Sequence, residues 1–246
     1  MEKSYVWGID LGGTKIECAV LSAADLTQVI ARERIDTEAS KGYEHIISQV
    51  ARLVSRVSEQ LGVSPTRIGF ATPGVLNPAT QTMKNCNTTS MNGRPMAADL
   101  AKALGVEVRL ANDANCFALA ETLMGAVQEV NPNAEVVFGI IMGTGVGGGL
   151  VVHGQVINGL HGIGGEWGHN ILEEGGKPCY CGKSGCVEHV ISGPALEEYY
   201  EAVSGQKLRM PQILQSHLAG TDAAATASIE RMLENFGRAV STLINV

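Results

Sequence analysis

Three cysteines and one histidine lie in a single glycine-rich segment of this 246-residue chain. The spacing is Cys179-x-Cys181-x-x-x-x-Cys186, and His169 stands ten residues before the first cysteine. Three thiolates and one imidazole complete the tetrahedral shell of a zinc ion without an open position, so the pattern predicts a structural metal site. Three unpaired loop cysteines and a disulfide are the alternatives, and the reducing cytosol disfavours the disulfide.

Two glutamates flank the same segment. Glu166 stands three residues before His169, and Glu188 directly follows the cysteine cluster. Glu166 by itself would more often be a surface residue. A metal ion bound to the cysteines and the histidine would instead hold both carboxylates within one small region.

Two glycine-and-threonine turns each join two β-prone runs. The first, DLGGTK, covers residues 10–15, and the second, GTG, covers residues 143–145. Glycines at such turns let backbone N–H groups approach an anion closely, and a hydroxyl and a lysine can add contacts. One such turn alone is more often an ordinary hairpin. Two of them, in two halves that open in the same way, favour a bound nucleotide.

Asn112 and Asp113 stand where a predicted strand meets a predicted helix. Both residue types are favoured at the N-cap of a helix, which is the structural interpretation. The end of a strand is also where α/β proteins place chemistry, and a carboxylate there could take a proton from a hydroxyl during phosphate transfer. The local sequence leaves the two interpretations equal.

The elements that must position these residues follow from hydrophobic periodicity. In the first half, strands are predicted at residues 5–10, 15–21, 29–35, 67–71 and 107–110. Helices are predicted there at residues 43–57, 96–104 and 114–123. In the second half, strands are predicted at residues 136–142 and 148–153, and helices at residues 194–203, 211–217 and 223–246. Residues 125–134 are predicted to be a connection.

Composition excludes several classes of protein. Hydrophobic residues make up 45% of the chain and charged residues 17%, which is typical of a globular protein. The formal net charge of −7 argues against a general nucleic-acid or anionic-membrane surface. No run is apolar enough for a membrane span, and the N-terminus lacks the layout of a signal peptide. We therefore expect a cytoplasmic protein with no nucleic-acid or membrane partner.

With these motifs in place, the chain resembles the ROK group of sugar kinases, a name that joins repressors, open reading frames and kinases. The likeness lies in GIDLGGTK, GTGVGGG, ANDAN and the signature GEWGH…CYCG…GC.E, and it runs from the first strand to the last residue. The resemblance implies an α/β fold of two ribonuclease-H-like domains of the actin and hexokinase type, with a cleft between them and a zinc-stapled loop in the second. The domains are expected at residues 1–120 and 121–246.

The resemblance also implies roles for individual residues. Asp113 would be the base that takes the proton from the sugar hydroxyl, usually the 6-hydroxyl. The other sugar contacts would come from Gly74, Asn112, Glu166, His169 and Glu188. The phosphates and Mg²⁺ of ATP would be held by Asp10, Gly12, Gly13, Thr14, Lys15, Gly143, Thr144 and Gly145. The zinc ligands would be His169, Cys179, Cys181 and Cys186, with the second nitrogen of His169 turned to a sugar hydroxyl.

The activity that the resemblance implies is transfer of the γ-phosphate of ATP to a hexose, with Mg²⁺ and a structural zinc. The motifs are closest to fructose and mannose kinases, while glucose and N-acetylhexosamines stay open. A sugar sensor without catalysis is the alternative. The resemblance further implies a homodimer at full length, and a strand, a glycine-rich turn and a helix after STLINV. Repressors of the family carry an N-terminal helix-turn-helix, but the few residues before the first predicted strand leave no room for one, so we do not expect a repressor. Without those last parts, we expect sugar binding, weak ATP binding and little turnover.

Overall fold

The computed structural model describes residues 4–244 and divides the chain into two compact units. Unit 1 comprises Met1–Val137 and Leu150–Gly164, and unit 2 comprises Phe138–Gly149 and Gly165–Val246. The sequence predicts a boundary at residues 120/121, which lies inside helix α3 (Asp113–Met124). In the structure, the chain instead passes between the units within the hairpin of β8 (Val136–Met142) and β9 (Val146–Val152).

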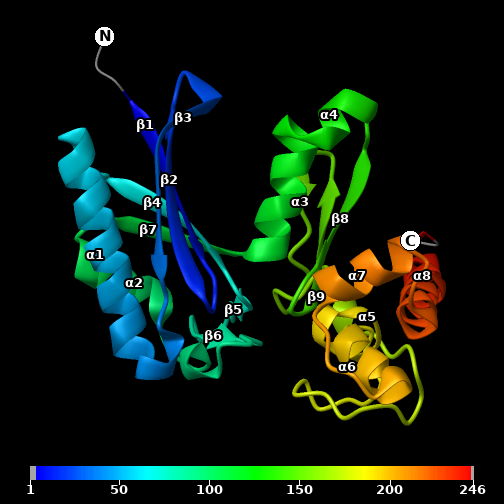
Figure 1. The fold of residues 1–246 in the computed structure, drawn as a ribbon. Coiled ribbons are helices and arrows are strands. Elements are labelled where there is room, and N and C mark those ends of the chain that lie inside the picture. The colour runs from blue at the N-terminus through cyan, green and yellow to red at the C-terminus, as the bar shows by residue number, and fades with distance from the viewer. Residues whose placement is uncertain (1–3, 245–246) are drawn as a thin grey trace. The chain divides into compact units, whose positions relative to one another are not determined.

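Unit 1 is built on a five-stranded sheet in the order β3-β2-β1-β4-β7 (Figure 1). Its strands are β1 (Tyr5–Leu11), β2 (Lys15–Ser22), β3 (Asp25–Asp36), β4 (Arg67–Thr72) and β7 (Glu107–Asn112). The first three strands are antiparallel neighbours, while β4 is parallel to both β1 and β7. All five lie where the sequence predicts strands, and β3 begins four residues earlier than expected.

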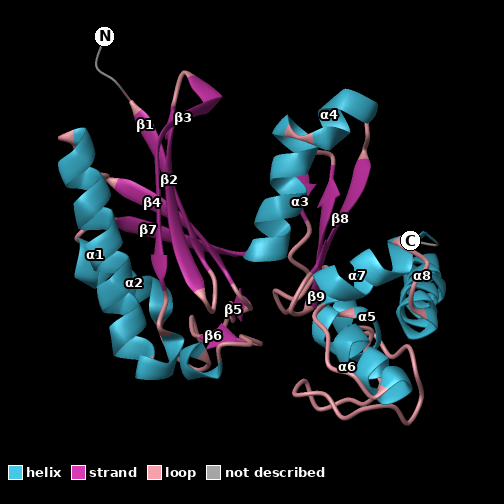
Figure 2. Ribbon diagram, in the orientation of Figure 1, coloured by secondary structure: helices cyan, strands magenta, loops and turns pink. Residues whose placement is uncertain are grey.

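Helices α1 (Tyr43–Leu61) and α2 (Met96–Leu104) lie along one face of this sheet (Figure 2). Helix α1 turns a continuous apolar stripe inward, because its apolar residues recur every three or four positions. Ile46, Val50 and Leu53 on that stripe are fully buried and belong to the core that includes the strand residues. The predicted amphipathic helix is therefore confirmed, and it anchors the sheet that carries the first glycine turn.

Unit 1 contains several further short elements. A two-stranded ribbon pairs β5 (Val75–Leu76) with β6 (Met83–Lys84), and 3₁₀ turns cover Ala39–Lys41 and Thr89–Met91. Helix α4 (Ala126–Val130) stands where the sequence predicts only a connection, so that prediction is wrong. The helix forms because α3 supplies its polar contacts: a carboxylate oxygen of Glu121 accepts the Ala126 N–H at 2.8 Å.

Strands β8 and β9 form a three-stranded sheet with β10 (Gln155–Val156). Unit 2 adds a 3₁₀ turn at Trp167–His169 and the helices α5 (Glu188–Ile191), α6 (Gly193–Ser204), α7 (Met210–Leu218) and α8 (Ala223–Ile244). The core is centred on Trp167, whose ring meets those of Phe138 and Phe236 edge to face at centroid distances of 6.1 and 6.5 Å. The indole N–H donates to the Gly147 carbonyl at 2.8 Å, so the buried ring keeps its hydrogen bond.

The three long helices of unit 2 match their predicted positions to within one or two residues. Residues 245 and 246 of the last predicted helix lie outside the described residues. Among the helices that the structure describes, none combines the length and the apolar character that a membrane span requires.

The core of unit 1 gives a direct test of the packing of α1. Leu53→Ala should lower the free energy of unfolding by about 2–5 kcal/mol, because it leaves a cavity between the helix and the sheet. Arg52→Ala, at the exposed neighbouring position, should change it by less than about 0.5 kcal/mol. Urea denaturation of both variants measures the difference, and equal losses would contradict the predicted orientation of the helix.

Candidate functional site

The DLGGTK segment forms the turn that joins β1 to β2. The Gly12 N–H donates to the Lys15 carbonyl at 2.9 Å, which closes the turn. Asp10 is on β1, and its pKa is raised by burial and by the neighbouring carboxylate of Glu17. Lys15 begins β2, and its ammonium forms an exposed ion pair with Asp36. A phosphate would therefore have to draw Lys15 away from Asp36, a competition that the sequence does not reveal.

Asn112 is both the N-cap of α3 and a support for the neighbouring loop. Its side-chain oxygen accepts the Asn115 N–H at 3.1 Å, and its side-chain nitrogen donates to the Gly74 carbonyl at 3.2 Å. Gly74 has a φ of +83°, and a Cβ there would lie 2.5 Å from the Lys84 carbonyl oxygen. Only glycine fits this close approach, which keeps the loop next to the end of β7.

Asp113 follows as the first residue of α3, at an exposed position, although neighbouring protein atoms partly desolvate its carboxylate. Burial raises the pKa of Asp113, and the charge of Asp10 raises it further. The Ala114 N–H donates to Oδ1 of Asp113 at 2.7 Å, which acts in the opposite direction. A carboxylate with a raised pKa is a stronger base than one in water, so the site has the electrostatics of a proton acceptor.

A cavity of about 340 Å³ adjoins Asn112 in unit 1. Asn115 and Asn158 also line it, and the residues around it are uncharged. The side-chain oxygen of Asn115 is buried and has no hydrogen-bond partner among the described residues. The volume is in the range of small-molecule sites, and amides with apolar neighbours suit a neutral polar ligand.

The second glycine turn, Gly143 to Gly145, joins β8 to β9 and is tied to two helices of unit 2. The Gly143 carbonyl accepts the Gly193 N–H at the start of α6, at 2.9 Å. The first N–H of β9, from Val146, donates to a carboxylate oxygen of Glu188 at 3.0 Å. Glu188, at the start of α5, is therefore held beside this turn.

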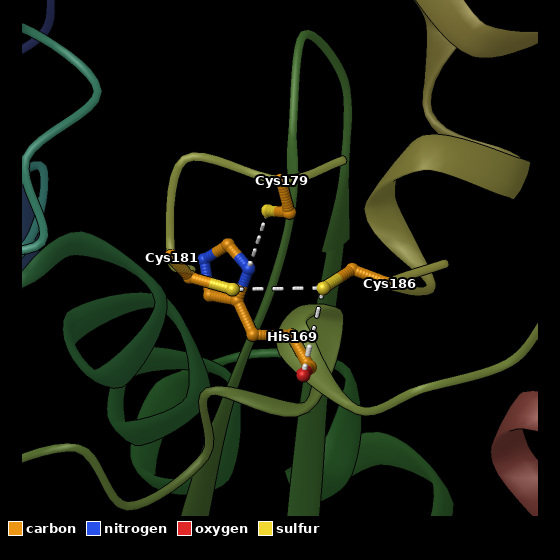
Figure 3. Close-up of side chains that lie close together, drawn as sticks. All are labelled: His169, Cys179, Cys181 and Cys186. Atoms are coloured by element: carbon orange, nitrogen blue, oxygen red, sulfur yellow. Dashed lines mark hydrogen bonds between the residues drawn. The ribbon is translucent and has the colours of Figure 1, made fainter. Parts of the chain in front are cut away.

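The three cysteines and His169 come together in unit 2, as their spacing predicts (Figure 3). Their candidate ligand atoms all lie within 4.8 Å of one another. The sulfurs of Cys181 and Cys186 are 3.6 Å apart, as are the Cys179 sulfur and Nδ1 of His169. Ligands on a tetrahedral zinc, with bonds of about 2.0–2.3 Å, are separated by about 3.5–3.8 Å. The cysteines are unpaired, and a disulfide would need sulfurs at about 2.05 Å.

The electrostatics of this cluster suit a cation. Burial raises the pKa of the Cys186 thiol to about 12, and the neighbouring cysteines add to the effect. A divalent ion would reverse this effect, because it stabilises thiolates. Burial also lowers the pKa of His169, which keeps its imidazole in the neutral form that binds metals.

Two glycines allow the segment that carries Glu166 and His169 to lie directly on β9. Gly165 has a φ of +91°, and a Cβ there would be 2.4 Å from the Gly148 carbonyl oxygen. At Gly168, a Cβ would lie only 1.9 Å from the Val146 carbonyl oxygen. No other residue type fits without moving the strand, so these glycines fix the place of the histidine.

Tyr180 stands between Cys179 and Cys181, and its hydroxyl contacts Nε2 of His169, the ring nitrogen that faces away from Cys179. Its hydroxyl lies 3.1 Å from Nε2, and the two rings meet edge to face at a centroid distance of 5.1 Å. The resemblance to the ROK kinases implies a sugar hydroxyl at this nitrogen and gives Tyr180 no role. In the structure, a sugar would have to share or replace the tyrosine contact. An aromatic residue between Cys179 and Cys181 is the feature of the sequence that could have indicated this contact.

The structure brings some of the predicted residues together within each unit. The cysteines, His169 and the Glu188 region are assembled in unit 2, together with the second glycine turn and the segment that contains Glu166. Unit 1 contains the remaining set, which comprises Asp10, Gly12, Gly13, Thr14, Lys15, Gly74, Asn112 and Asp113. Sequence reasoning missed Thr37, whose hydroxyl donates to the Gly12 carbonyl at 2.7 Å.

Comparisons with known proteins agree on one family. The sequence model of the ROK family matches residues 6–246. An N-acetyl-D-glucosamine kinase of Pasteurella multocida is 36% identical over 98% of this chain and 80% of its own length. One from Pectobacterium carotovorum is 32% identical over 98% and 79%.

Solved structures give the same result. A ROK hexokinase from Thermus thermophilus matches with a TM-score of 0.80 and 32% identity, over 98% of this chain and 78% of its own. A ROK glucokinase from Streptomyces griseus, solved with glucose and AMPPNP, matches with a TM-score of 0.82 and 24% identity, over 98% and 80%. The second likeness supports the fold alone.

The raised pKa of Asp113 makes its charge a cost to folding. In the unfolded chain Asp113 loses its proton near the ordinary pKa of 3.8, whereas in the folded chain it loses it at a higher pH. The free energy of unfolding therefore falls as the pH rises from 3.8 through the folded pKa. Asp113→Asn should therefore be more stable than the wild type at pH 7, and the difference should vanish below pH 3.8. Denaturant titrations across this range measure it.

The control is Asp25→Asn, since the pKa of the exposed Asp25 is lowered by its contacts with Thr27. That variant should gain no stability at pH 7. A loss of stability in Asp113→Asn at pH 7 would mean that burial does not penalise the Asp113 carboxylate.

Proposed function

The chain belongs to the ROK family, and we propose that it transfers the γ-phosphate of ATP to a hydroxyl group of a sugar, with Asp113 as the general base. It is thus an ATP-dependent sugar kinase, the class to which its curated relatives belong. The observation that carries the assignment of Asp113 is its position. Asp113 is at the start of α3, next to Asn112, which lines the uncharged cavity, and its pKa is raised by desolvation and by the charge of Asp10.

The chemistry follows from these positions. The sugar oxygen attacks the γ-phosphorus while its proton passes to the carboxylate of Asp113, and the bond from the γ-phosphorus to the β,γ-bridging oxygen breaks to release ADP. The N–H groups of the two glycine turns bind phosphate oxygens. Asp10 offers the carboxylate oxygen that Mg²⁺ prefers, and the ion would neutralise charge on the phosphates.

Glu166, Glu188 and His169 are proposed to bind sugar hydroxyls. Carboxylate oxygens accept hydrogen bonds from such hydroxyls, and Glu188 is already held at the Val146 N–H. An N-acetylhexosamine is the first substrate to test, because the curated relatives described above are named N-acetyl-D-glucosamine kinases. Fructose, mannose and glucose complete the panel, since the motifs of the sequence point to the first two.

The cluster of His169, Cys179, Cys181 and Cys186 is proposed to hold one structural zinc ion. The support is the donor set, the tetrahedral separations of the ligand atoms and the neutral histidine. Such an ion would join the turn that carries His169 to the loop before Glu188. It would take no part in the transfer of phosphate, because four protein ligands leave no open position.

Asp113→Asn should lower kcat by a factor of about 100 or more, because the amide cannot accept the proton. Sugar binding should persist, since the amide keeps the size and the oxygen that receives the Ala114 N–H. Measurements of ADP release and calorimetric titration with each sugar separate the two effects. Asp25→Asn is the matched control and should behave as the wild type.

If the Asp113→Asn variant phosphorylates sugars at nearly the wild-type rate, Asp113 is not the general base. Sugar binding without turnover, under saturating ATP and Mg²⁺ and with the segments expected after STLINV present, would instead favour a sugar sensor. A chain that binds no sugar of the panel would contradict both functions.

Elemental analysis of the purified protein should find about one zinc ion per chain. Cys181→Ser should lose it, because the hydroxyl is a poor ligand for zinc, and a strong chelator should lower the melting temperature of the wild type only. Cys18→Ala is the matched control, since Cys18 is buried in the core of unit 1. Its zinc content should stay unchanged, and equal zinc in Cys181→Ser would contradict the proposed ligand set.

A further inference from the structure

Thr37 lies directly after β3 and is fully buried. Its hydroxyl donates to the Gly12 carbonyl at 2.7 Å, and its own N–H donates to the Thr14 carbonyl at 2.9 Å. One residue therefore contacts two of the carbonyls in the first glycine turn, 25 and 23 positions earlier in the chain. Nothing in the local sequence around Thr37 indicates this contact.

We propose that Thr37 is a positioning residue for ATP, which fixes the direction of the phosphate-binding N–H groups in the turn between β1 and β2. The inference rests on the proposed function of that turn. Thr37 itself is buried and does not contact the nucleotide.

The geometry of the peptide bond gives the mechanism. In a trans peptide, the C=O of one residue and the N–H of the next point in opposite directions. The Gly12 carbonyl points at Thr37, so the Gly13 N–H points away from it. By the same argument, the Lys15 N–H points away from Thr37. The Gly13 N–H is thus oriented before an anion arrives, while the Lys15 N–H faces the inside of the hairpin, and binding need not reorder the turn.

The turn between β1 and β2 is flexible without an added hydrogen bond. Glycines have more conformational freedom than other residues, so Gly12 and Gly13 would let the peptide between them rotate. The antiparallel ladder of β2 and β3 ends at the pair of Lys15 and Asp36. Thr37 extends the contact one residue beyond that ladder and reaches across to the turn.

Thr37 is in turn held by helix α1. The side chain of Gln49, which is buried on α1, donates to the Asp36 carbonyl at 2.9 Å. That carbonyl and the Thr37 N–H belong to one peptide group, whose N–H donates to the Thr14 carbonyl. The peptide is therefore fixed at both ends, and the rigid helix is connected to the flexible turn through Thr37.

Thr37→Val tests the inference, because valine keeps the shape and the backbone N–H but removes the hydroxyl donor. It should raise both KM for ATP and the calorimetric Kd for ATP about three- to tenfold, in line with the loss of one hydrogen bond. KM for the sugar should stay within about twofold of the wild type. Thr37→Ser, which keeps the hydroxyl, should restore most of the ATP affinity.

Thr122→Val is the matched control. The Thr122 hydroxyl is also buried and donates to a backbone carbonyl, that of Ala118 in α3, at 2.7 Å. Its loss should lower the melting temperature without a change in KM for ATP.

Three outcomes would overturn the inference. Unchanged ATP affinity in Thr37→Val would show that the hydroxyl does not position the turn. Equal rises in both KM values would assign Thr37 a merely structural role. If the wild type itself neither binds ATP nor phosphorylates any sugar, the proposed function fails first and this inference with it.

Discussion

Backbone-to-backbone contact at glycine is the constraint on which both groups of candidate residues depend. A Cβ at Gly168 would lie 1.9 Å from the carbonyl oxygen of Val146, and one at Gly74 would lie 2.5 Å from that of Lys84. The segment that carries His169 in unit 2, and the loop of Gly74 in unit 1 to which Asn112 donates, can therefore approach a neighbouring strand only because these positions lack a side chain. Because these loops lie directly on a strand backbone, the strands determine where the candidate side chains next to the glycines lie.

Partial desolvation of the candidate carboxylates opposes their ionisation, and hydrogen bonds offset this effect only in part. Asp113 accepts the Ala114 N–H yet keeps a raised pKa. The pKa of Asp10 is raised both by burial and by the neighbouring carboxylate of Glu17. Glu188 accepts the Val146 N–H at 3.0 Å. A carboxylate with a raised pKa is what the proposed role of Asp113 as a proton acceptor requires.

The sequence predicts the elements of this protein well where one period dominates, as in α1, whose apolar stripe admits only one orientation on the sheet. It also predicts that His169 and the three cysteines come together, because they lie within one short segment whose spacing is itself the signal. Thr37 and Tyr180 could not be found in this way. The contact of Thr37 with Gly12 joins residues 25 positions apart through a β-ladder, and Tyr180 became relevant only when the ring of His169 was oriented. The exposed pairing of Lys15 with Asp36 depends on the register of β2 and β3, which composition does not reveal.

Asn112 shows why the structural and functional interpretations of a residue need not exclude each other. From the local sequence, an N-cap and a site residue were equally good explanations. In the structure the two roles use different atoms, since the side-chain oxygen caps α3 and the side-chain nitrogen holds the Gly74 carbonyl. An aspartate at this position could cap the helix but could not donate to Gly74, and a serine would be too short to do both. The amide is therefore the one polar side chain of this size that joins the start of α3, and with it Asp113, to the loop of Gly74.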